Sequence, residues 1–370
     1  MRQSPNSTAS LARWAVTLAG LALGLAACGG TSVVETPVVE TPVVEGTTYT
    51  VGVDGSSDEM NVSLLKFFPR SVTVHAGDTI EFQRPENGEM HTVTLGTAVP
   101  TSVGIPGSNF FRGGFGGEPI AGRSMPCYLS QGQPPSDGCS GQEQEPVPFD
   151  GTQSWHNSGG LIGEGKYNLQ LADDIEPGIY SFFCLIHTSE MRGTIRVVDP
   201  DQPADDPEEV AAQGAEEFDR RLGNLLRAVE TGVSPPESTV LASLFTTESF
   251  GAEVPNWAMQ FFPEEIEVPV GEPVTWEVRG DHTISFNAPE AARPFYERGD
   301  DGRIVENELA ATPVGVSSST TWDGAGFLNS GLLSGFVPPR RFSITFTQPG
   351  TYTYFCLVHF GMEGKVNVTG

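Results

Sequence analysis

Hydrophobic and polar residues alternate most regularly in two stretches of the chain, residues 67–82 and 261–276. The stretches align with each other without a gap, and in both of them apolar and polar side chains alternate on either side of a central glycine. Alternation with a period of two is typical of β-strands that bury one face. A glycine interrupts both stretches at the same place, Gly77 in one and Gly271 in the other, and predicts a turn between two strands. The pattern therefore predicts a β-rich unit that occurs twice.

The duplication continues along both halves of the chain. Each half carries, in the same order, a histidine before a β-branched run, an Asn-Ser-Gly motif, a Pro-Gly turn and a strand that ends in a cysteine. These landmarks are His91, Asn157-Ser-Gly159, Pro177-Gly178 and Cys184 in the first half, and His282, Asn329-Ser-Gly331, Pro349-Gly350 and Cys356 in the second. We expect two tandem antiparallel β domains, over residues 48–199 and 245–370.

The segment between the halves, residues 200–244, predicts a linker with one helix. Asp206 can cap a helix that begins at Pro207, and Gly232 ends it. Apolar side chains then recur on one helical face, at Phe218, Leu222, Leu225, Leu226 and Val229. We expect this face to pack on one β domain or between the two.

The N-terminus predicts export. Residues 1–27 combine two arginines with an apolar run that is too short and too sharply ended for a spanning helix, which is typical of a signal peptide. The run ends in Leu25-Ala-Ala-Cys28, which resembles the bacterial lipobox and implies lipid on Cys28. Residues 28–47 then repeat an acidic, proline-bearing unit and are expected to form an extended tether. We predict a periplasmic or otherwise extracytoplasmic protein, lipid-anchored to a bacterial membrane.

Composition narrows the partners. The formal net charge of −27 argues against nucleic acid and favours a basic protein partner, or a solvated acidic surface without one. The 44 glycines and 29 prolines suit a turn-rich β protein better than a helical one.

Two cysteines lie in a Gly/Pro-rich insertion, residues 96–150, that only the first half carries. In an oxidising compartment we expect Cys127 and Cys139 to form a disulfide that closes a short surface loop. We expect the insertion to cover or border the site of the first half.

Each half offers four residues to one metal site. The candidate metal ligands are His91, Cys184, His187 and Met191 in the first half, and His282, Cys356, His359 and Met362 in the second. Two imidazoles and a thiolate with a weak axial thioether are the ligands of a blue-copper centre. Zinc fits less well, because a thioether is a poor zinc ligand.

At these residues the chain resembles the cupredoxins, in particular the plastocyanin/amicyanin-like group. The loop Cys-x-x-His-x-x-Met-x-Gly of the second half is similar to that of amicyanin, whereas the first half has one more residue before Met191. The resemblance implies an all-β fold, two tandem Greek-key β-sandwiches joined by a short helical linker. It also implies one-electron transfer at type 1 copper, one per domain, with a redox protein partner such as a cytochrome or a terminal oxidase. Apolar loop residues would offer the docking face: Leu185, Ile186, Leu357, Val358 and Phe360.

Missing residues argue against an enzyme. Of the six histidines, four are candidate ligands (6 − 4 = 2), and the other two, His75 and His156, cannot build a trinuclear copper cluster. We expect both at the surface. No motif for a nucleophile or a phosphate loop is present. Two alternatives stay open: a copper delivery or storage protein, and a scaffold module in which only the second site holds metal.

Overall fold

The computed structural model describes residues 46–370, apart from residues 58–59, 86–88, 100–108, 115–116, 140–144, 164, 233, 250–252 and 317–319. The predicted signal peptide and Cys28 therefore lie outside the described residues. Both β domains belong to one compact unit, Glu45–Gly370. Among the described residues, no helix has the length and apolar character needed to span a membrane.

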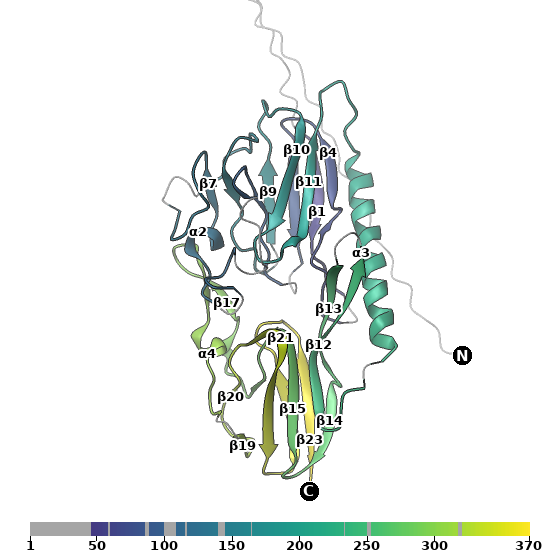
Figure 1. Ribbon diagram of the computed structural model, residues 1–370, viewed down its shortest axis with the longest axis vertical. Coiled ribbons are helices and arrows are strands. Elements are labelled where there is room, and N and C mark those ends of the chain that lie inside the picture. Colours follow the sequence, from purple (N-terminus) through teal and green to yellow (C-terminus); the bar gives the residue numbers. More distant parts are fainter. Residues whose placement is uncertain are drawn as a thin grey trace, which may run out of the picture. The chain divides into compact units, whose positions relative to one another are not determined.

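The first domain is a sandwich of two sheets (Figure 1). One sheet has the strand order β3-β1-β5-β9 and the other β4-β11-β10-β6-β8-β7. The strands are β1 (Thr48–Val53), β3 (Phe67–Phe68), β4 (Ser71–Val74), β5 (Thr79–Arg84), β6 (Thr94–Leu95), β7 (Cys127–Leu129), β8 (Trp155–Asn157), β9 (Gly165–Gln170), β10 (Gly178–Cys184) and β11 (Thr188–Val197). Between the sheets, the rings of Phe67, Phe82 and Phe182 pack edge to face with centroids 4.7–5.9 Å apart. The alternating side chains of the sequence thus form the core.

The second domain repeats this sandwich. Its sheets have the orders β19-β21-β15-β12-β13-β2 and β14-β23-β22-β16-β20, in which β2 (Val62–Ser63) comes from the first domain. The strands are β12 (Thr239–Ser249), β13 (Glu253–Phe262), β14 (Glu265–Pro269), β15 (Pro273–His282), β16 (Ser285–Phe286), β19 (Thr320–Trp322), β20 (Leu328–Asn329), β21 (Leu333–Phe346), β22 (Gly350–Phe355) and β23 (Glu363–Thr369). The all-β prediction is confirmed. Strand pairing starts at Thr239, within the segment predicted as linker, because β12 pairs with β15.

The predicted turns at Gly77 and Gly271 join strands of different sheets. Gly77 has φ +81° and Gly271 has φ +88°, a left-handed conformation that glycine adopts without strain. The chain crosses there from β4 to β5 and from β14 to β15, which belong to opposite sheets. As a result β1 pairs with β5, and β4 with β11, in parallel. The prediction of purely antiparallel domains was wrong, because alternation alone does not tell a hairpin from a sandwich corner.

The two domains share backbone pairing and a second contact. Strand β2 (Val62–Ser63) of the first domain pairs with β13 and extends the sheet of the second. The hairpin β17 (Tyr296–Arg298) and β18 (Ile304–Glu306) of the second domain packs on the first-domain core through Ile304. Arg298 Nη2 donates to the carbonyl oxygen of Gly160 at 2.6 Å.

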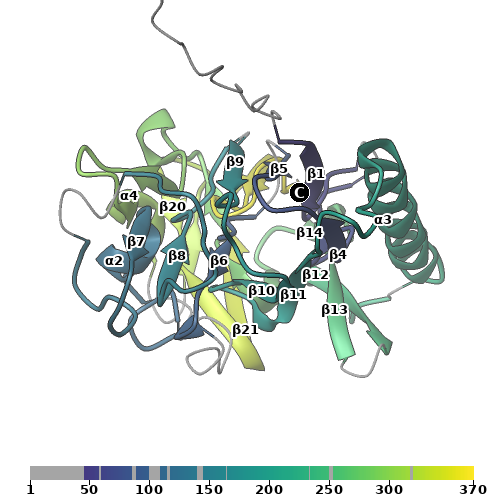
Figure 2. The ribbon, with the colours of Figure 1, turned by 90° about the horizontal axis from the view of Figure 1, so that it is seen from above.

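The linker forms helix α3 (Pro207–Glu230), which begins where the sequence predicted. The Asp206 side chain accepts hydrogen bonds from the backbone N–H groups of Glu208 and Glu209. The predicted apolar face packs between the domains, as one of the two expectations had it. It contacts Val62, Leu64 and Phe68 of the first domain and Ala258 of the second. Figure 2 shows α3 at the side of β12 and β13.

The insertion of the first domain contributes a strand instead of a separate surface loop. Strand β7 pairs with β8 and continues the larger sheet, and a short helix, α2 (Ala121–Ser124), precedes it. The predicted disulfide between Cys127 and Cys139 is present. Cys127 is fully buried and belongs to the domain core, so the disulfide anchors the insertion from inside.

Candidate metal centres

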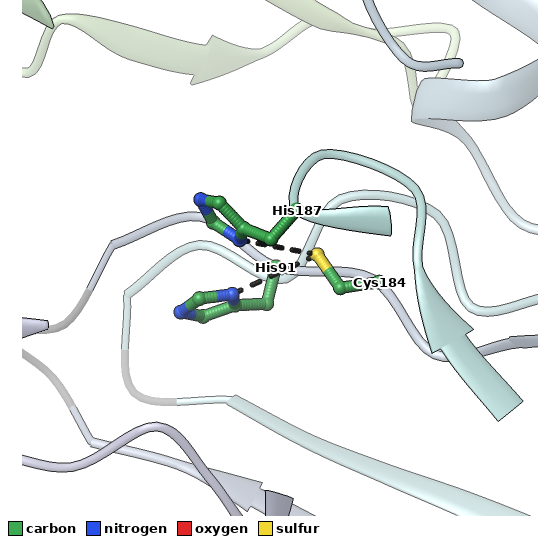
Figure 3. Close-up of side chains that lie close together, drawn as sticks. All are labelled: His91, Cys184 and His187. Atoms are coloured by element: carbon green, nitrogen blue, oxygen red, sulfur yellow. Dashed lines mark hydrogen bonds between the residues drawn. The ribbon is translucent and has the colours of Figure 1, made fainter. Parts of the chain in front are cut away.

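The first candidate centre brings together His91, Cys184 and His187 (Figure 3). Cys184 ends β10, and its sulfur lies 3.7 Å from Nδ1 of His91 and 3.4 Å from Nδ1 of His187. His91 lies 93 residues before Cys184 in the sequence, and its backbone forms a β-bridge with Leu161. All three side chains are buried, and His187 is the most exposed at 8%. The spacing in sequence therefore produces a converging set of one sulfur and two nitrogens.

The second candidate centre has the same construction from His282, Cys356 and His359. The Cys356 sulfur lies 3.6 Å from Nδ1 of His282 and 3.4 Å from Nδ1 of His359. The two Nδ1 atoms lie 3.1 Å apart. A metal about 2.0 Å from each nitrogen and about 2.3 Å from sulfur, in a trigonal arrangement, would separate sulfur from nitrogen by about 3.7 Å and the two nitrogens by about 3.5 Å. The sulfur–nitrogen distances fit such an ion, whereas the two nitrogens lie closer together than it requires.

Both predicted methionines are buried, Met191 and Met362. Met362 is tied to its centre, because its N–H donates to the His359 carbonyl and its own carbonyl accepts from Cys356 N–H at 2.9 Å. Met191 lies in β11 beside a register shift between Phe183 and Cys184. The extra residue of the first loop is therefore accommodated by a bulge.

A hydroxyl network that the sequence did not reveal holds each loop. Thr92 Oγ1 accepts from Leu185 N–H at 2.8 Å, and Thr283 Oγ1 accepts from Leu357 N–H at 2.7 Å. The Asn-Ser-Gly motifs support the same strands: Ser158 Oγ accepts from Val93 N–H. Ser330 Oγ likewise accepts from Ile284 N–H. The repeat of these residues in both halves was the available signal, but their task appears only in three dimensions.

The surroundings of both cysteines favour the thiolate form. Burial alone would raise the pKa of the Cys184 thiol, but His187 and His91 beside it hold that pKa well below its ordinary value. The pKa of the Cys356 thiol is lowered in the same way, with burial opposed by His359 and His282. A thiolate is the form of cysteine that binds metal.

The outer nitrogens of the four histidines meet four oxygen contacts. His91 Nε2 lies 3.1 Å from Asp54 Oδ2, and His282 Nε2 lies 2.8 Å from Ser243 Oγ. One carboxylate, Glu89, serves the remaining two histidines. Its Oε2 lies 3.5 Å from His187 Nε2, and its Oε1 lies 3.2 Å from His359 Nε2. Sequence patterns gave no hint of Asp54, Ser243 or Glu89, because none belongs to a repeated motif.

The two remaining histidines do not both lie at the surface. His75 follows the end of β4 half-buried, and its Nε2 lies 2.9 Å from the carbonyl oxygen of Gln202. His156 is only 2% exposed, so the prediction of a surface position was wrong. Its ring packs against Tyr128 and Phe149, and burial lowers its pKa to about 4 against the raising effect of Asp150. Strand β8 turns this position inward, where its counterpart Leu328 is also buried.

The predicted docking face is largely absent. Leu185, Ile186 and Leu357 are buried, whereas Phe360 is 71% exposed. Leu357 packs with Phe295 in a satellite cluster of the second domain. Leu185 and Ile186 belong to the core of the first domain, so Phe360 is the exposed member of the predicted face.

Residues 249–369 match the family model described as copper binding proteins, plastocyanin/azurin family. This match includes all four candidate ligands of the second centre. The second domain is therefore similar to the plastocyanin/azurin family of copper-binding proteins.

Similar solved structures match 35–42% of this chain. A novel purple cupredoxin from Nitrosopumilus maritimus is 20% identical, with 35% of this chain and 98% of that chain covered and a TM-score of 0.20. Reduced auracyanin from the photosynthetic bacterium Roseiflexus castenholzii is 16% identical, with 42% and 98% covered and a TM-score of 0.24. Amicyanin from Paracoccus versutus is 19% identical, with 38% and 87% covered and a TM-score of 0.18. No curated protein matches the chain.

Proposed function

We propose that this protein is an exported, lipid-anchored electron carrier that binds one type 1 copper in each domain. The observation that carries the proposal is the recurrence of one buried donor set with matching distances, 3.7 and 3.4 Å from sulfur to nitrogen in the first centre and 3.6 and 3.4 Å in the second. The proposed ligands are those predicted from the sequence: His91, Cys184, His187 and Met191, and His282, Cys356, His359 and Met362. Copper held by such soft donors supplies reversible one-electron chemistry.

The protein contributes a fixed set of donors. Buried threonine hydroxyls anchor the loops after Cys184 and Cys356, so the backbone beside each sulfur is held to the residue that follows His91 or His282. Burial keeps water from the donors and leaves little room for the rings to turn. Donors that stay in place in both oxidation states lower the reorganisation that accompanies electron transfer.

Location and partner are further parts of the proposal. Cys28 would carry the lipid, and the tether of residues 28–47 would hold the β domains near a bacterial membrane on its extracytoplasmic side. The net charge of −27 favours a basic redox protein over nucleic acid. Catalysis on a substrate is not part of the proposal. Delivery or storage is less well supported, because the donors are at most 8% exposed and a chaperone must release its ion.

The test is a Cu(II) titration of the protein lacking residues 1–28, followed by visible absorption. We expect a blue thiolate-to-copper band that saturates at two equivalents. Cys184→Ala and Cys356→Ala, each the control for the other, should each bind one equivalent. A band that saturates at one equivalent and disappears only with Cys356→Ala would make the first domain structural. Absence of any blue band would overturn the proposal.

A further inference from the structure

Glu89 lies in the first half of the duplication and has no counterpart in the second half. It precedes His91 by two residues, and the equivalent position before His282 is Gly280. The carboxylate therefore exists once, although there are two centres. The side chain is 20% exposed and contacts one histidine from each domain.

The direction of each histidine ring makes these contacts specific. His187 and His359 both turn Nδ1 toward their cysteine sulfur, at 3.4 Å in each case. Nε2 is then the nitrogen left to carry a proton and to donate. An ionised carboxylate only accepts, and its two oxygens can serve two donors at once. The side chain of Glu89 has the chemistry to hold both rings.

A hydroxyl of the first domain also contacts Glu89. Ser63 Oγ lies 2.8 Å from Glu89 Oε2 and 2.8 Å from Asp54 Oδ2. Its hydroxyl links Glu89 to the carboxylate beside His91.

We propose that Glu89 bridges the two centres: its carboxylate orients His359 through a hydrogen bond and His187 through an ion-pair contact at 3.5 Å, and it forms the path His187–Glu89–His359 for electron exchange within the chain. This inference rests on the proposed function. One electron crosses the path, so that the centre it leaves is oxidised and the centre it enters is reduced. No proton is transferred, because both imidazoles keep the Nε2 proton and Glu89 remains the acceptor. Glu89 acts here as a positioning residue.

The closing experiment compares Glu89→Ala and Glu89→Gln with Glu81→Gln in the full chain. Glu81 is a matched control, because it lies in the preceding strand β5, is equally 20% exposed and pairs with Lys166 instead of a histidine. The first readout is the nitrogen-15 NMR spectrum of the Cu(I)-loaded protein. We expect slowly exchanging Nε2–H signals from His187 and His359 in the unaltered protein and in Glu81→Gln. Both signals should be lost to solvent exchange in Glu89→Ala.

The second readout is the rate of internal electron exchange after flash reduction of half the sites. Partners of histidine ligands typically change function by about 10–100-fold when removed, so we expect a fall of that size in Glu89→Ala. The amide of Glu89→Gln has one oxygen acceptor in place of two, so it should keep one ring signal and fall between the other two proteins.

Several results would overturn the bridge. One is an unchanged exchange rate in Glu89→Ala while its copper content stays at two equivalents. Another is a third ion in a zinc titration that is lost with Glu89→Gln, since Asp54, Glu89 and His91 also lie close enough to share a metal. Copper content is measured separately. Fewer than two equivalents in the unaltered protein would therefore count against the proposed function, whereas the ring signals of Glu89→Ala would still test the positioning role.

Discussion

The two candidate centres have equivalent donors but different outer contacts. Each histidine that opens a centre meets a residue of positive φ, Asp54 at +59° in the first domain and Ser243 at +70° in the second. These positions are equivalent, because β1 pairs with β5 in the register that β12 keeps with β15. The backbone is thus conserved between the halves, while the contact changes from a carboxylate to a hydroxyl.

The two sites therefore share the same histidines and cysteine but differ in the residue that contacts one histidine from outside. A carboxylate on the outer nitrogen raises the basicity of a histidine ligand and stabilises the more positive oxidation state. The first centre, with Asp54 and Glu89, should have the lower reduction potential, and the second, with Ser243 and Glu89, the higher one. Electrons would then pass from the first domain to the second.

The largest expected effect concerns the disulfide, which the second domain lacks among its described residues. Replacing both Cys127 and Cys139 by alanine should destabilise the first domain by about 3 kcal/mol, because the closed loop spans a sequence separation of 12 residues. Alanine is preferred to serine, since a hydroxyl at the buried Cys127 would lack a partner. The free energy of unfolding of each domain can be measured by urea unfolding, with the blue band of its own copper as the signal. An equal loss of stability in both domains would show that the domains unfold as one unit.

The next effect concerns the contact that distinguishes the centres. Asp54→Ser should weaken copper binding in the first centre by about 10–100-fold, and Ser243→Asp should strengthen it in the second. If a substitution changes the affinity for the oxidised ion tenfold more than the affinity for the reduced ion, the reduction potential moves by about 59 mV. The shift is upward for Asp54→Ser and downward for Ser243→Asp. Spectroelectrochemical titration measures both centres, and the unaltered one is the internal control. In the protein that carries both substitutions, the order of the two reduction potentials should reverse. An unchanged order would refute this account of the difference.

Much of the architecture could be predicted from the sequence because it depends on local patterns. Alternating apolar residues predicted the strands, and Asp206 with Pro207 predicted the start of α3, which is confirmed. The six histidines and cysteines could be singled out because the same order occurs in both halves, and the structure brings each set of three together. Their binding of a metal stays a prediction.

The surroundings of the donors could not be predicted, since they depend on contacts between distant segments. Glu89 meets His359 across a sequence separation of 270 residues, and no periodicity encodes such a pair. The burial of Leu357 also depends on distant segments, here of its own domain, because it packs with Ala292, Phe295 and Ala310. Where the domains touch, the sequence of either half alone is insufficient.

The smallest expected effect concerns His156, whose counterpart in the second domain is Leu328. The buried imidazole has a pKa of about 4, against about 6.5 in an unfolded chain. Between these two pKa values the imidazole is protonated in the unfolded state but not in the folded state. The free energy of unfolding therefore decreases as the pH falls from 6.5 toward 4. His156→Leu removes this term. Relative to the unaltered metal-free protein, the variant should gain about 1 kcal/mol between pH 6.5 and pH 5.5. Urea unfolding at both pH values measures the change, with His75→Gln as the control at a half-buried histidine. Stability curves of the two proteins that remain parallel over this range would mean that His156 is protonated in the folded domain.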